Sequence, residues 1–275
     1  MNILQSIVLG LIQGITEFFP ISSSGHLVVV PYFSGWDYPP LYFTVTVHLA
    51  TLFAVLTVLY RDAWRIIRGF ALGLFNRKWR RSTDFKMGLY IIIATVPAVL
   101  MGLFLNEFVG SIFSRPLIVA VFLLLTALIL WGGEYRGRKV RQKKFLTYLS
   151  SIASGIGQAL AVFPGISRAG ATISFARFFG VKREEAVRFS FLLSIPIILG
   201  SFVFELSRST TTVLNGGGNT VWILFAGLVS AYLSGFFAIK YLLYLTKKKN
   251  LNIFAVYCVC LSIAIFAFYI INNII

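Results

Sequence analysis

Apolar stretches of about 18 or more residues recur along this chain, and they restrict it to very few folds. A transmembrane helix needs about 20 such residues, whereas a strand of a membrane barrel shows about ten with alternating polarity. Hydrophobic residues make up 58% of the 275 residues, and charged residues only 12%. The chain is therefore predicted to be an all-α polytopic membrane protein, folded as one integral membrane domain over residues 1–275.

Basic residues gather in three connections between these stretches, and they orient the predicted spans. Short connections rich in Lys and Arg stay on the cytoplasmic side of a membrane. The outer connections are predicted at residues 31–40 and 209–219, which contain no Lys or Arg. The three basic connections run from Arg61 to Lys86, from Arg136 to Lys144 and from Lys247 to Lys249. Alternation between the two sides then predicts six crossings, at residues 42–60, 88–106, 116–133, 187–206, 221–245 and 251–271.

The net charge of +16 is explained by the same connections. Anionic lipid head groups are sufficient partners for Lys and Arg beside membrane spans, so no nucleic acid is expected to bind. Cys258 and Cys260 lie two residues apart in an apolar stretch, where a mutual disulfide is geometrically implausible. They are expected to face lipid or to pack inside the protein, and they do not indicate a compartment.

Two further regions, residues 1–30 and 145–181, each contain an apolar helix, a polar break with proline and a second apolar helix. Basic residues flank the second region at both ends, so it is predicted to enter and leave on the cytoplasmic side as a re-entrant hairpin. By the same reasoning, residues 1–30 are predicted to enter from the outer side. They look like a secretion signal, but they lack a basic beginning and carry Glu17 and His26, so they are expected to belong to the mature protein.

An internal repeat supports this arrangement. The stretch "GLIQGITEFFPISSSG" (10–25) is similar to "GIGQALAVFPGISRAG" (155–170) in its Gly, Gln, Phe-Pro, Ser and Gly positions. Because the two stretches run in opposite directions, they predict an inverted-topology repeat with halves of approximately 1–133 and 145–271, and such repeats place a site at their interface. Chance similarity between apolar segments is the alternative.

The first polar segment, "QGITEFFPISSSGHL" (13–27), contains chemistry that a membrane span does not need. Gln13 and Glu17 are four residues apart and share a helix face. An ionisable residue inside the membrane is costly, so Glu17 is a candidate functional residue, although it could serve only as a hydrogen-bond acceptor for nearby backbone. The candidates that follow it are Ser22, Ser23, Ser24 and His26, with Ser22 and Ser24 as candidate diphosphate-binding residues. One of these serines is also expected to cap the next helix.

The second polar segment, "PGISRAGAT" (164–172), has the character of an anion site. Arg168 is a permanent cation whose planar guanidinium suits phosphate oxygens. Small residues and a helix N-terminus let backbone N–H groups reach an anion. The candidate diphosphate-binding residues here are Gly165, Ser167, Arg168, Gly170 and Thr172. Arg168 could also form an ion pair with Glu17, and with the site empty both interpretations could be true.

Together the two polar segments offer the components of phosphoryl transfer, namely a phosphate-binding cation, a hydroxyl, a histidine and a carboxylate. Glu17 could also hold a hard divalent cation, which binds oxygen ligands and bridges phosphates. A transition-metal site is not expected, because the chain contains only His26 and His48 and no cysteine lies near them. His48 stands alone in an apolar span and is expected to be a packed, hydrogen-bonded residue.

At these residues the chain resembles the undecaprenyl-diphosphate phosphatase family, also called the bacitracin-resistance protein family. The resemblance covers nearly the whole chain and rests on both polar segments and on "FSFLLSIP" (189–196). It implies an integral enzyme of the bacterial plasma membrane that hydrolyses C55 isoprenyl diphosphate to the monophosphate. This reaction recycles the lipid carrier for peptidoglycan and other wall polymers and depends on a divalent cation, expected to be Mg²⁺ or Ca²⁺.

Matched by position, the resemblance implies an acidic element at Gln13 and Glu17, a serine nucleophile at Ser23 and a histidine at His26. It implies phosphate binding at the group formed by Ser167, Arg168 and Thr172. Gln13 stands where some members have Glu, which makes it a doubtful metal ligand and leaves the charge to Glu17. Ala169 stands where serine is common, so one hydroxyl donor is absent.

Several points stay open at this stage. The attacking group is Ser23 or an activated water. A transporter or flippase of a phosphorylated polyprenyl lipid is the alternative function, because inverted repeats with broken helices are also a transport architecture. The resemblance and the orientation of the first hairpin favour a site that opens to the outer, periplasmic side. Expected partners are a polyprenyl diphosphate and membrane lipids, and a monomer and a homodimer are both open.

Overall fold

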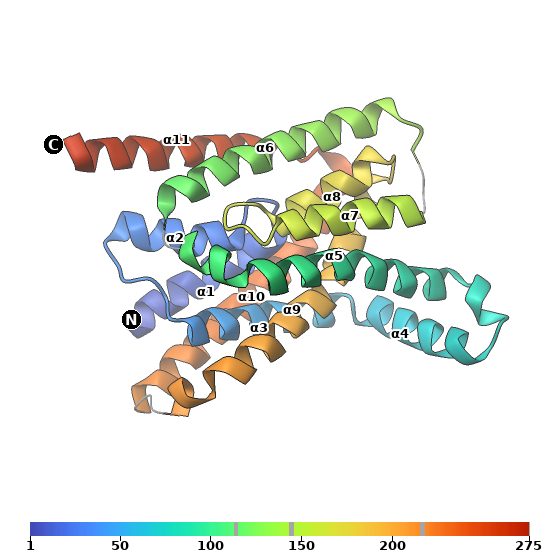
Figure 1. Ribbon diagram of the computed structural model, residues 1–275, viewed down its shortest axis with the longest axis horizontal. Coiled ribbons are helices and arrows are strands. Elements are labelled where there is room, and N and C mark those ends of the chain that lie inside the picture. Colours follow the sequence, from blue (N-terminus) through green and yellow to red (C-terminus); the bar gives the residue numbers. More distant parts are fainter. Residues whose placement is uncertain (113–114, 143–145, 215–217, 275) are drawn as a thin grey trace.

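The computed structural model describes the chain except residues 113–114, 143–145, 215–217 and 275, and it leaves the side chains at 106–112, 205–214, 218–219 and 273–274 undescribed. Every regular element in the described part is a helix (Figure 1). The predicted all-α class is confirmed.

Six helices in the described part are long and apolar enough to cross a membrane, which confirms the predicted number of spans. Their apolar windows have mean hydropathies between 1.9 and 2.5. The spans lie within α3 (Leu41–Val58), α5 (Thr83–Ile112), α6 (Pro116–Lys139), α9 (Arg183–Leu214), α10 (Gly218–Lys248) and α11 (Asn252–Ile274). The protein is therefore a multi-pass membrane protein.

Four shorter helices form the two predicted hairpins, each interrupted by a break. These helices are α1 (Ile3–Phe18), α2 (Ser23–Ser34), α7 (Tyr148–Leu160) and α8 (Arg168–Phe178). With 16, 12, 13 and 11 residues they are shorter than the roughly 20 residues that a crossing needs. Their lengths are consistent with re-entrant hairpins, and the repeat boundaries at 1–133 and 145–271 stay a prediction.

The first basic connection is more ordered than predicted. Residues 60–75 form the helix α4 (Tyr60–Phe75), and a short 3₁₀ helix, η1 (Trp79–Arg81), leads into α5. Helix α4 packs on α5 through glycines: a Cβ added to Gly69 would lie 2.6 Å from Asp84 Cβ, and one added to Gly73 would lie 2.1 Å from a Phe85 ring carbon. The predicted basic connection therefore contains helices that the charge pattern alone did not predict, and small residues on one face of this segment allow them to pack.

The outer connections are shorter than predicted. Helix α2 continues to Ser34, so the first connection begins at Gly35, whose φ of +64° ends the helix. Helix α9 continues to Leu214, beyond the predicted end at 206, and residues 215–217 of the second connection lie outside the described residues.

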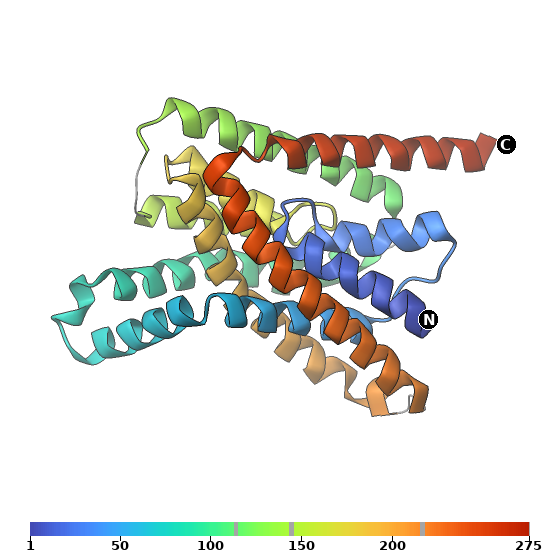
Figure 2. The ribbon, with the colours of Figure 1, turned by 180° about the vertical axis from the view of Figure 1, so that it is seen from behind.

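The two ends of the molecule differ in character (Figures 1 and 2). Both chain termini, the α2–α3 connection and the α9–α10 end lie at one end. The α4–α5, α6–α7 and α10–α11 connections, which contain the basic clusters, lie at the opposite end. Lys143 and Lys144 lie outside the described residues. The arrangement agrees with the span directions inferred from charge.

Each hairpin packs against a long helix from the other half of the chain. Helix α1 approaches α10 so closely that a Cβ on Gly14 would meet Ala231 O at 2.3 Å. Helix α7 approaches α5 in the same way, since a Cβ on Gly155 would lie 2.9 Å from Ala94 Cα. Small residues are typical of closely packed membrane helices. These contacts hold the two breaks in the interior of the bundle.

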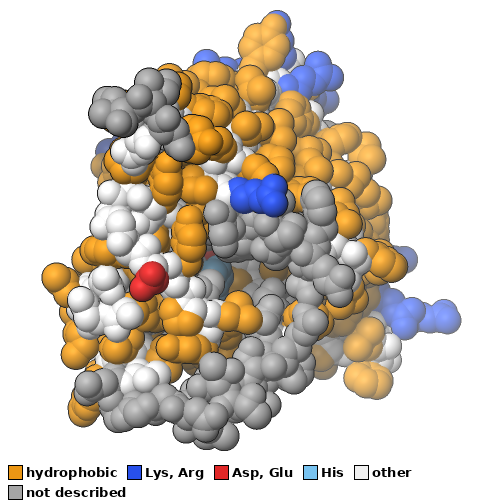
Figure 3. Space-filling model, turned by 60° about the vertical axis from the view of Figure 1, so that its left-hand side comes forward, with side chains coloured by type: hydrophobic (Ala, Val, Ile, Leu, Met, Phe, Trp, Pro, Cys, Tyr) orange, Lys and Arg blue, Asp and Glu red, His pale blue; other side chains and the backbone are white. Residues whose placement is uncertain are grey.

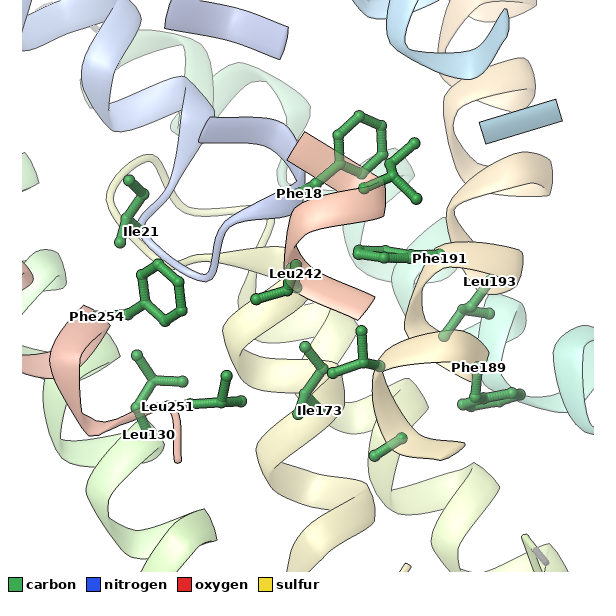
Figure 4. Packing of buried hydrophobic residues seen from close by; sticks show 14 of the residues in the cluster. Phe18, Ile21, Leu130, Ile173, Phe189, Phe191, Leu193, Leu242, Leu251 and Phe254 are labelled. Carbon is green, nitrogen blue, oxygen red and sulfur yellow. The ribbon is translucent and has the colours of Figure 1, made fainter. Parts of the chain in front are cut away.

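Aromatic and aliphatic side chains fill the space around the breaks (Figure 4). Phe18, the last residue of α1, contacts Phe191 of α9 edge to face, with ring centroids 5.4 Å apart. Ile21 in the first break and Ile173 of α8 belong to the same buried cluster. Of the two cysteines, Cys258 is buried and Cys260 is exposed, so one packs inside and the other faces outward.

Candidate active site

The two breaks meet in the interior through the hydroxyl of Ser22. Ser22 Oγ accepts the N–H of Gly25, which caps α2, and also the N–H of Gly165 in the second break, each at 3.2 Å. The breaks are so close that a Cβ on Gly25 would lie 3.3 Å from Gly165 Cα. The hydrogen bond from Gly165 to Ser22 thus connects two residues that are 143 positions apart in the sequence.

Ser22 has an unusual backbone conformation. Its φ of +71° makes it the one non-glycine residue with positive φ in the described part of the chain. Such a conformation costs about 1–3 kcal/mol and persists where the surroundings enforce it. The two hydrogen bonds to its hydroxyl are such an enforcement, and they place the start of α2 against the second break.

A threonine on α6 supports the second break. Thr126 Oγ1 donates to Gly165 O at 2.8 Å and accepts the N–H of Ser167 at 3.0 Å. Ser167 Oγ in turn accepts the N–H of Gly170 at 3.0 Å and caps α8. Gly165 has a φ of +102°, which side-chain-bearing residues rarely adopt. The N-terminus of α8 is therefore fixed beside the N-terminus of α2.

Glu17 is the centre of the candidate site. Its Oε1 accepts a hydrogen bond from Arg168 Nη2 at 2.9 Å, in an ion pair between the two polar segments. Its Oε2 accepts hydrogen bonds from Ser23 Oγ at 2.5 Å and from Gln13 Nε2 at 3.0 Å. The predicted ion pair and the predicted shared face of Gln13 and Glu17 are both confirmed.

Arg168 is held in place but keeps donors free for a ligand. Its Nη1 donates to Ser190 O on α9 at 3.2 Å, and the Ser190 hydroxyl shares a hydrogen bond of 2.6 Å with Thr172 Oγ1. The guanidinium has further N–H groups beyond these two. Because Arg168 is also the first residue of α8, its charge lies at a helix N-terminus, where anions bind favourably.

Several predicted diphosphate ligands belong to the supporting frame. Ser22, Ser167 and Thr172 are buried, and their hydroxyls bond within the protein. Gly165 and Gly170 pack tightly, with Gly170 against Ser167 and Pro20. Half-buried Ser24 has its hydroxyl 3.3 Å from that of Ser22. Direct phosphate contacts by these residues stay predictions.

His26 does not contact the Glu17 cluster by any hydrogen bond or ion pair among the described residues. Its Nδ1 bonds to Ser22 O and its Nε2 to the Tyr257 hydroxyl, both at 2.7 Å. Its ring also stacks on Tyr257 of α11, at a centroid distance of 5.7 Å and an interplanar angle of 9°. Both ring nitrogens are thus occupied, and the role of His26 in proton transfer stays a prediction.

His48 lies at the site although the sequence placed it alone in a span. Its Nε2 is 3.7 Å from Glu17 Oε2, and its Nδ1 bonds to Thr44 O at 2.8 Å. The bond to Thr44 confirms the predicted hydrogen-bonded histidine, whereas the contact with Glu17 was not predicted. The signal that could have revealed it is the cost of an imidazole in a membrane span, which applies to His48 as it does to Glu17.

The residues present do not form a divalent-metal site by themselves. Both oxygens of Glu17 already accept hydrogen bonds from protein donors, one of them from a guanidinium. Gln13 Oε1 is buried without a partner and is a single neutral oxygen. Among the described residues no group of three or more His, Cys, Asp or Glu could hold a metal ion. Mg²⁺ and Ca²⁺ bind six or more oxygens, so waters and phosphate oxygens would have to provide most of the ligands beside the described residues.

The end of the molecule that carries the termini is hollowed, and a histidine side chain is visible within the hollow (Figure 3). His26 is 5% exposed, whereas the His48 side chain is 30% exposed. His48 is thus the more exposed of the two histidines, and it is the one that contacts Glu17.

Comparison with known proteins shows which family this chain belongs to. Residues 6–264 match the family model described as "Bacitracin resistance protein BacA". The undecaprenyl-diphosphatase of Methanosphaera stadtmanae is 37% identical over 272 residues, 96% of this chain and 96% of that protein. That of Korarchaeum cryptofilum is 40% identical over 269 residues, 96% of this chain and 98% of that protein. That of Moorella thermoacetica is 38% identical over 267 residues, 97% and 98% of the two chains. This chain belongs to the BacA family.

Proposed function

We propose that the protein is an undecaprenyl-diphosphatase, which hydrolyses undecaprenyl diphosphate to undecaprenyl phosphate and inorganic phosphate. The observation that carries this proposal is the contact of Glu17 with both Arg168 and Ser23, where two broken helices meet inside a membrane bundle. Relatives named for this activity cover nearly the whole chain. The reaction recycles the lipid carrier for peptidoglycan synthesis.

The diphosphate binds where positive charge and backbone donors converge. Arg168 and the N-termini of α2 and α8 supply N–H groups to the phosphate oxygens. These donors lie in a protein interior of low dielectric, where they stabilise the charge that develops during phosphoryl transfer more strongly than water does. The polyprenyl chain stays among the exposed apolar faces of the spans, and membrane lipids surround both.

Attack on the terminal phosphorus begins at Ser23 or at a water in its place. The Ser23 hydroxyl donates to Glu17 Oε2 at 2.5 Å, so the carboxylate is positioned to take the proton as the oxygen–phosphorus bond forms. The bridging phosphorus–oxygen bond breaks, and undecaprenyl phosphate leaves with the electron pair. If Ser23 attacks, a water molecule then hydrolyses the phosphoserine, which releases inorganic phosphate and restores the Ser23 hydroxyl. If water attacks, inorganic phosphate forms directly. Arg168 holds the opposite oxygen of Glu17 and keeps the carboxylate in this orientation.

The divalent cation belongs to the substrate in this proposal. A Mg²⁺ or Ca²⁺ ion brought by the diphosphate would neutralise part of the negative charge beside Arg168. We place the enzyme in the bacterial plasma membrane, with the hollow facing the outer side. The basic connections then lie on the cytoplasmic side.

A phosphate-release assay tests the proposal. Purified protein in detergent is given undecaprenyl diphosphate with Mg²⁺, and we expect inorganic phosphate and undecaprenyl phosphate in equal amounts, with strongly reduced release after chelation. The alternative function, a transporter or flippase, requires no Ser23–Glu17 contact. Movement of the intact diphosphate across proteoliposomes without phosphate release would establish that alternative and overturn ours.

A further inference from the structure

We propose that His48 is the terminal proton acceptor of this site and acts through Glu17. The inference rests on the proposed function and adds to it a residue on α3, outside both polar segments. It starts from the way the imidazole ring is held, which determines which nitrogen is free.

The bond to Thr44 fixes the state of the ring. A carbonyl oxygen only accepts hydrogen bonds, so the Nδ1 atom 2.8 Å from Thr44 O carries the hydrogen. In the neutral ring, Nε2 then has a lone pair and no hydrogen. This lone pair lies on the nitrogen that faces Glu17 Oε2 at 3.7 Å. Two acceptors face each other, and a proton between them turns repulsion into attraction.

The proton comes from the opposite side of the carboxylate. Glu17 Oε2 accepts the Ser23 hydroxyl at 2.5 Å and faces His48 Nε2 at 3.7 Å, so one oxygen connects the attacking group with the imidazole. As the oxygen–phosphorus bond forms, the O–H bond of the attacking hydroxyl breaks. Its proton passes to Glu17 Oε2 and then to His48 Nε2, while the leaving phosphate keeps the electron pair of the broken bridge.

His48 can release the proton, whereas both ring nitrogens of His26 are hydrogen-bonded within the protein. The His48 side chain is 30% exposed, so its ring can release the proton to water. His26 is 5% exposed and has both nitrogens bonded, to Ser22 O and to Tyr257. Of the two histidines in the chain, His48 therefore has the geometry of an acid–base group.

The charged residues around His48 come from several helices. Helix α1 presents Glu17, and α8 presents Arg168 on the other oxygen of that carboxylate. Among the described side chains of the other helices packed on α3, Lys240 of α10 lies over the Phe236 ring, and a separate cavity beyond Val58 is lined by Arg61, Asp62, Arg65, Glu184, Glu185, Arg188 and Lys247. The side chains at 205–214 of α9 lie outside the described part. Among the described side chains, Glu17 is therefore the charged group that faces His48 Nε2.

The pH profile of a His48→Gln variant tests the proposal. For the wild type we expect kcat/KM to fall at acidic pH as the acceptor becomes protonated. For His48→Gln we expect kcat to fall by roughly 10²-fold or more and KM to stay within about threefold. The part of the acidic decline that belongs to His48 should disappear, which leaves only the decline caused by protonation of Glu17. The matched variant His26→Gln should keep the acidic decline, whatever its stability. A His48→Gln enzyme with wild-type kcat and an unchanged profile would overturn the proposal.

Two further measurements do not depend on that variant folding normally. In His48→Ala, added imidazole should restore activity in proportion to its unprotonated fraction, and absence of rescue in a folded protein would count against the proposal. In the wild type, diethyl pyrocarbonate should modify His48 before His26 and inactivate the enzyme in parallel. Full activity after complete modification of His48 would refute it. If the wild type releases no phosphate, the proposed function itself fails, which is a separate result.

Discussion

Glu17 is contacted by side chains from four helices, and this convergence defines the site at the scale of single residues. Gln13 lies on α1, the same helix as Glu17, whereas Ser23 lies on α2, His48 on α3 and Arg168 on α8. A buried carboxylate is costly unless its oxygens are paired, so the surrounding donors make Glu17 tolerable inside the bundle. The same donors hold it in one orientation beside the Ser23 hydroxyl.

Ser23 and Ser24 provide a matched pair for the attacking group. Both are half-buried, but Ser23 donates to Glu17 whereas the Ser24 hydroxyl lies beside that of Ser22. If Ser23 attacks, Ser23→Ala should lower kcat by roughly 10³-fold or more, and a phosphoenzyme trapped in the wild type should map to Ser23. Ser24→Ala should change kcat by less than about tenfold. Inversion at phosphorus would instead assign the attack to water.

The sequence predicted most of the residues around Glu17, but not His48. Glu17, Arg168 and Ser23 could be found because charged and polar residues in apolar segments have few structural explanations. The position of His48 depends on how α3 packs against α1, which no local pattern encodes. The predicted serine cap of the helix after the first break is confirmed at Ser22, whereas the capping role of Ser167 was not predicted, because a serine in such a segment is equally compatible with capping and with ligand binding.

At the scale of elements, the two breaks are supported by hydrogen bonds that other helices provide. Ser22 joins the first break to the second, and Thr126 of α6 bonds to both Gly165 and Ser167. Irregular backbone at membrane depth requires such internal partners. The breaks were predictable from Pro and Gly in apolar sequence, whereas their partners on α6 were not.

Gly165 is expected to be intolerant of a side chain. Its φ is +102°, and a Cβ there would lie 2.7 Å from Val119 O. Gly165→Ala should lower the free energy of unfolding by roughly 1–3 kcal/mol and reduce activity, because the second break must shift. Gly102→Ala is the control, since nothing lies within 4 Å of its added Cβ. Thermal unfolding in detergent measures both, and equal stabilities would contradict this account.

A buried ion-pair group joins α6, α8 and α9 near the basic end. Glu134 accepts from Arg183 at 2.8 and 2.7 Å and from Arg177 at 3.4 Å. Glu134→Ala should cost roughly 3–5 kcal/mol, because the 2% exposed Arg177 side chain loses its counter-charge. Asp84→Ala, which breaks a pair with a 64% exposed Arg65, should cost less than about 1 kcal/mol. Similar melting temperatures for the two variants would argue against a structural role for this group.

At the scale of the whole molecule, the basic connections lie at one end and the hollow at the other (Figures 2 and 3). The number of spans and their alternation could be predicted, because the positions of apolar stretches and of Lys and Arg can be read along the chain. Helix α4 could not, because its arginines resemble a cytoplasmic loop and its packing on α5 depends on glycines spaced four residues apart.

This polarity predicts which residues face the cell exterior. In a background with Cys258 and Cys260 replaced by Ser, Asp37→Cys lies in the α2–α3 connection and Arg81→Cys in the basic α4–α5 connection. A membrane-impermeant thiol reagent should label Asp37→Cys in intact cells and Arg81→Cys only after permeabilisation. The reverse labelling pattern would show that the α2–α3 connection faces the cytoplasm, which would contradict the proposed orientation.

The most direct test of the site is phosphate release from undecaprenyl diphosphate by Arg168→Ala and Glu17→Ala. Each variant should lose at least about 10²-fold in kcat/KM while remaining folded, because the first removes the phosphate-binding cation and the second the proton acceptor beside Ser23. Arg81→Ala, an exposed arginine at the basic end, should retain activity. Full activity in either Arg168→Ala or Glu17→Ala would contradict the assignment of this cluster as the active site.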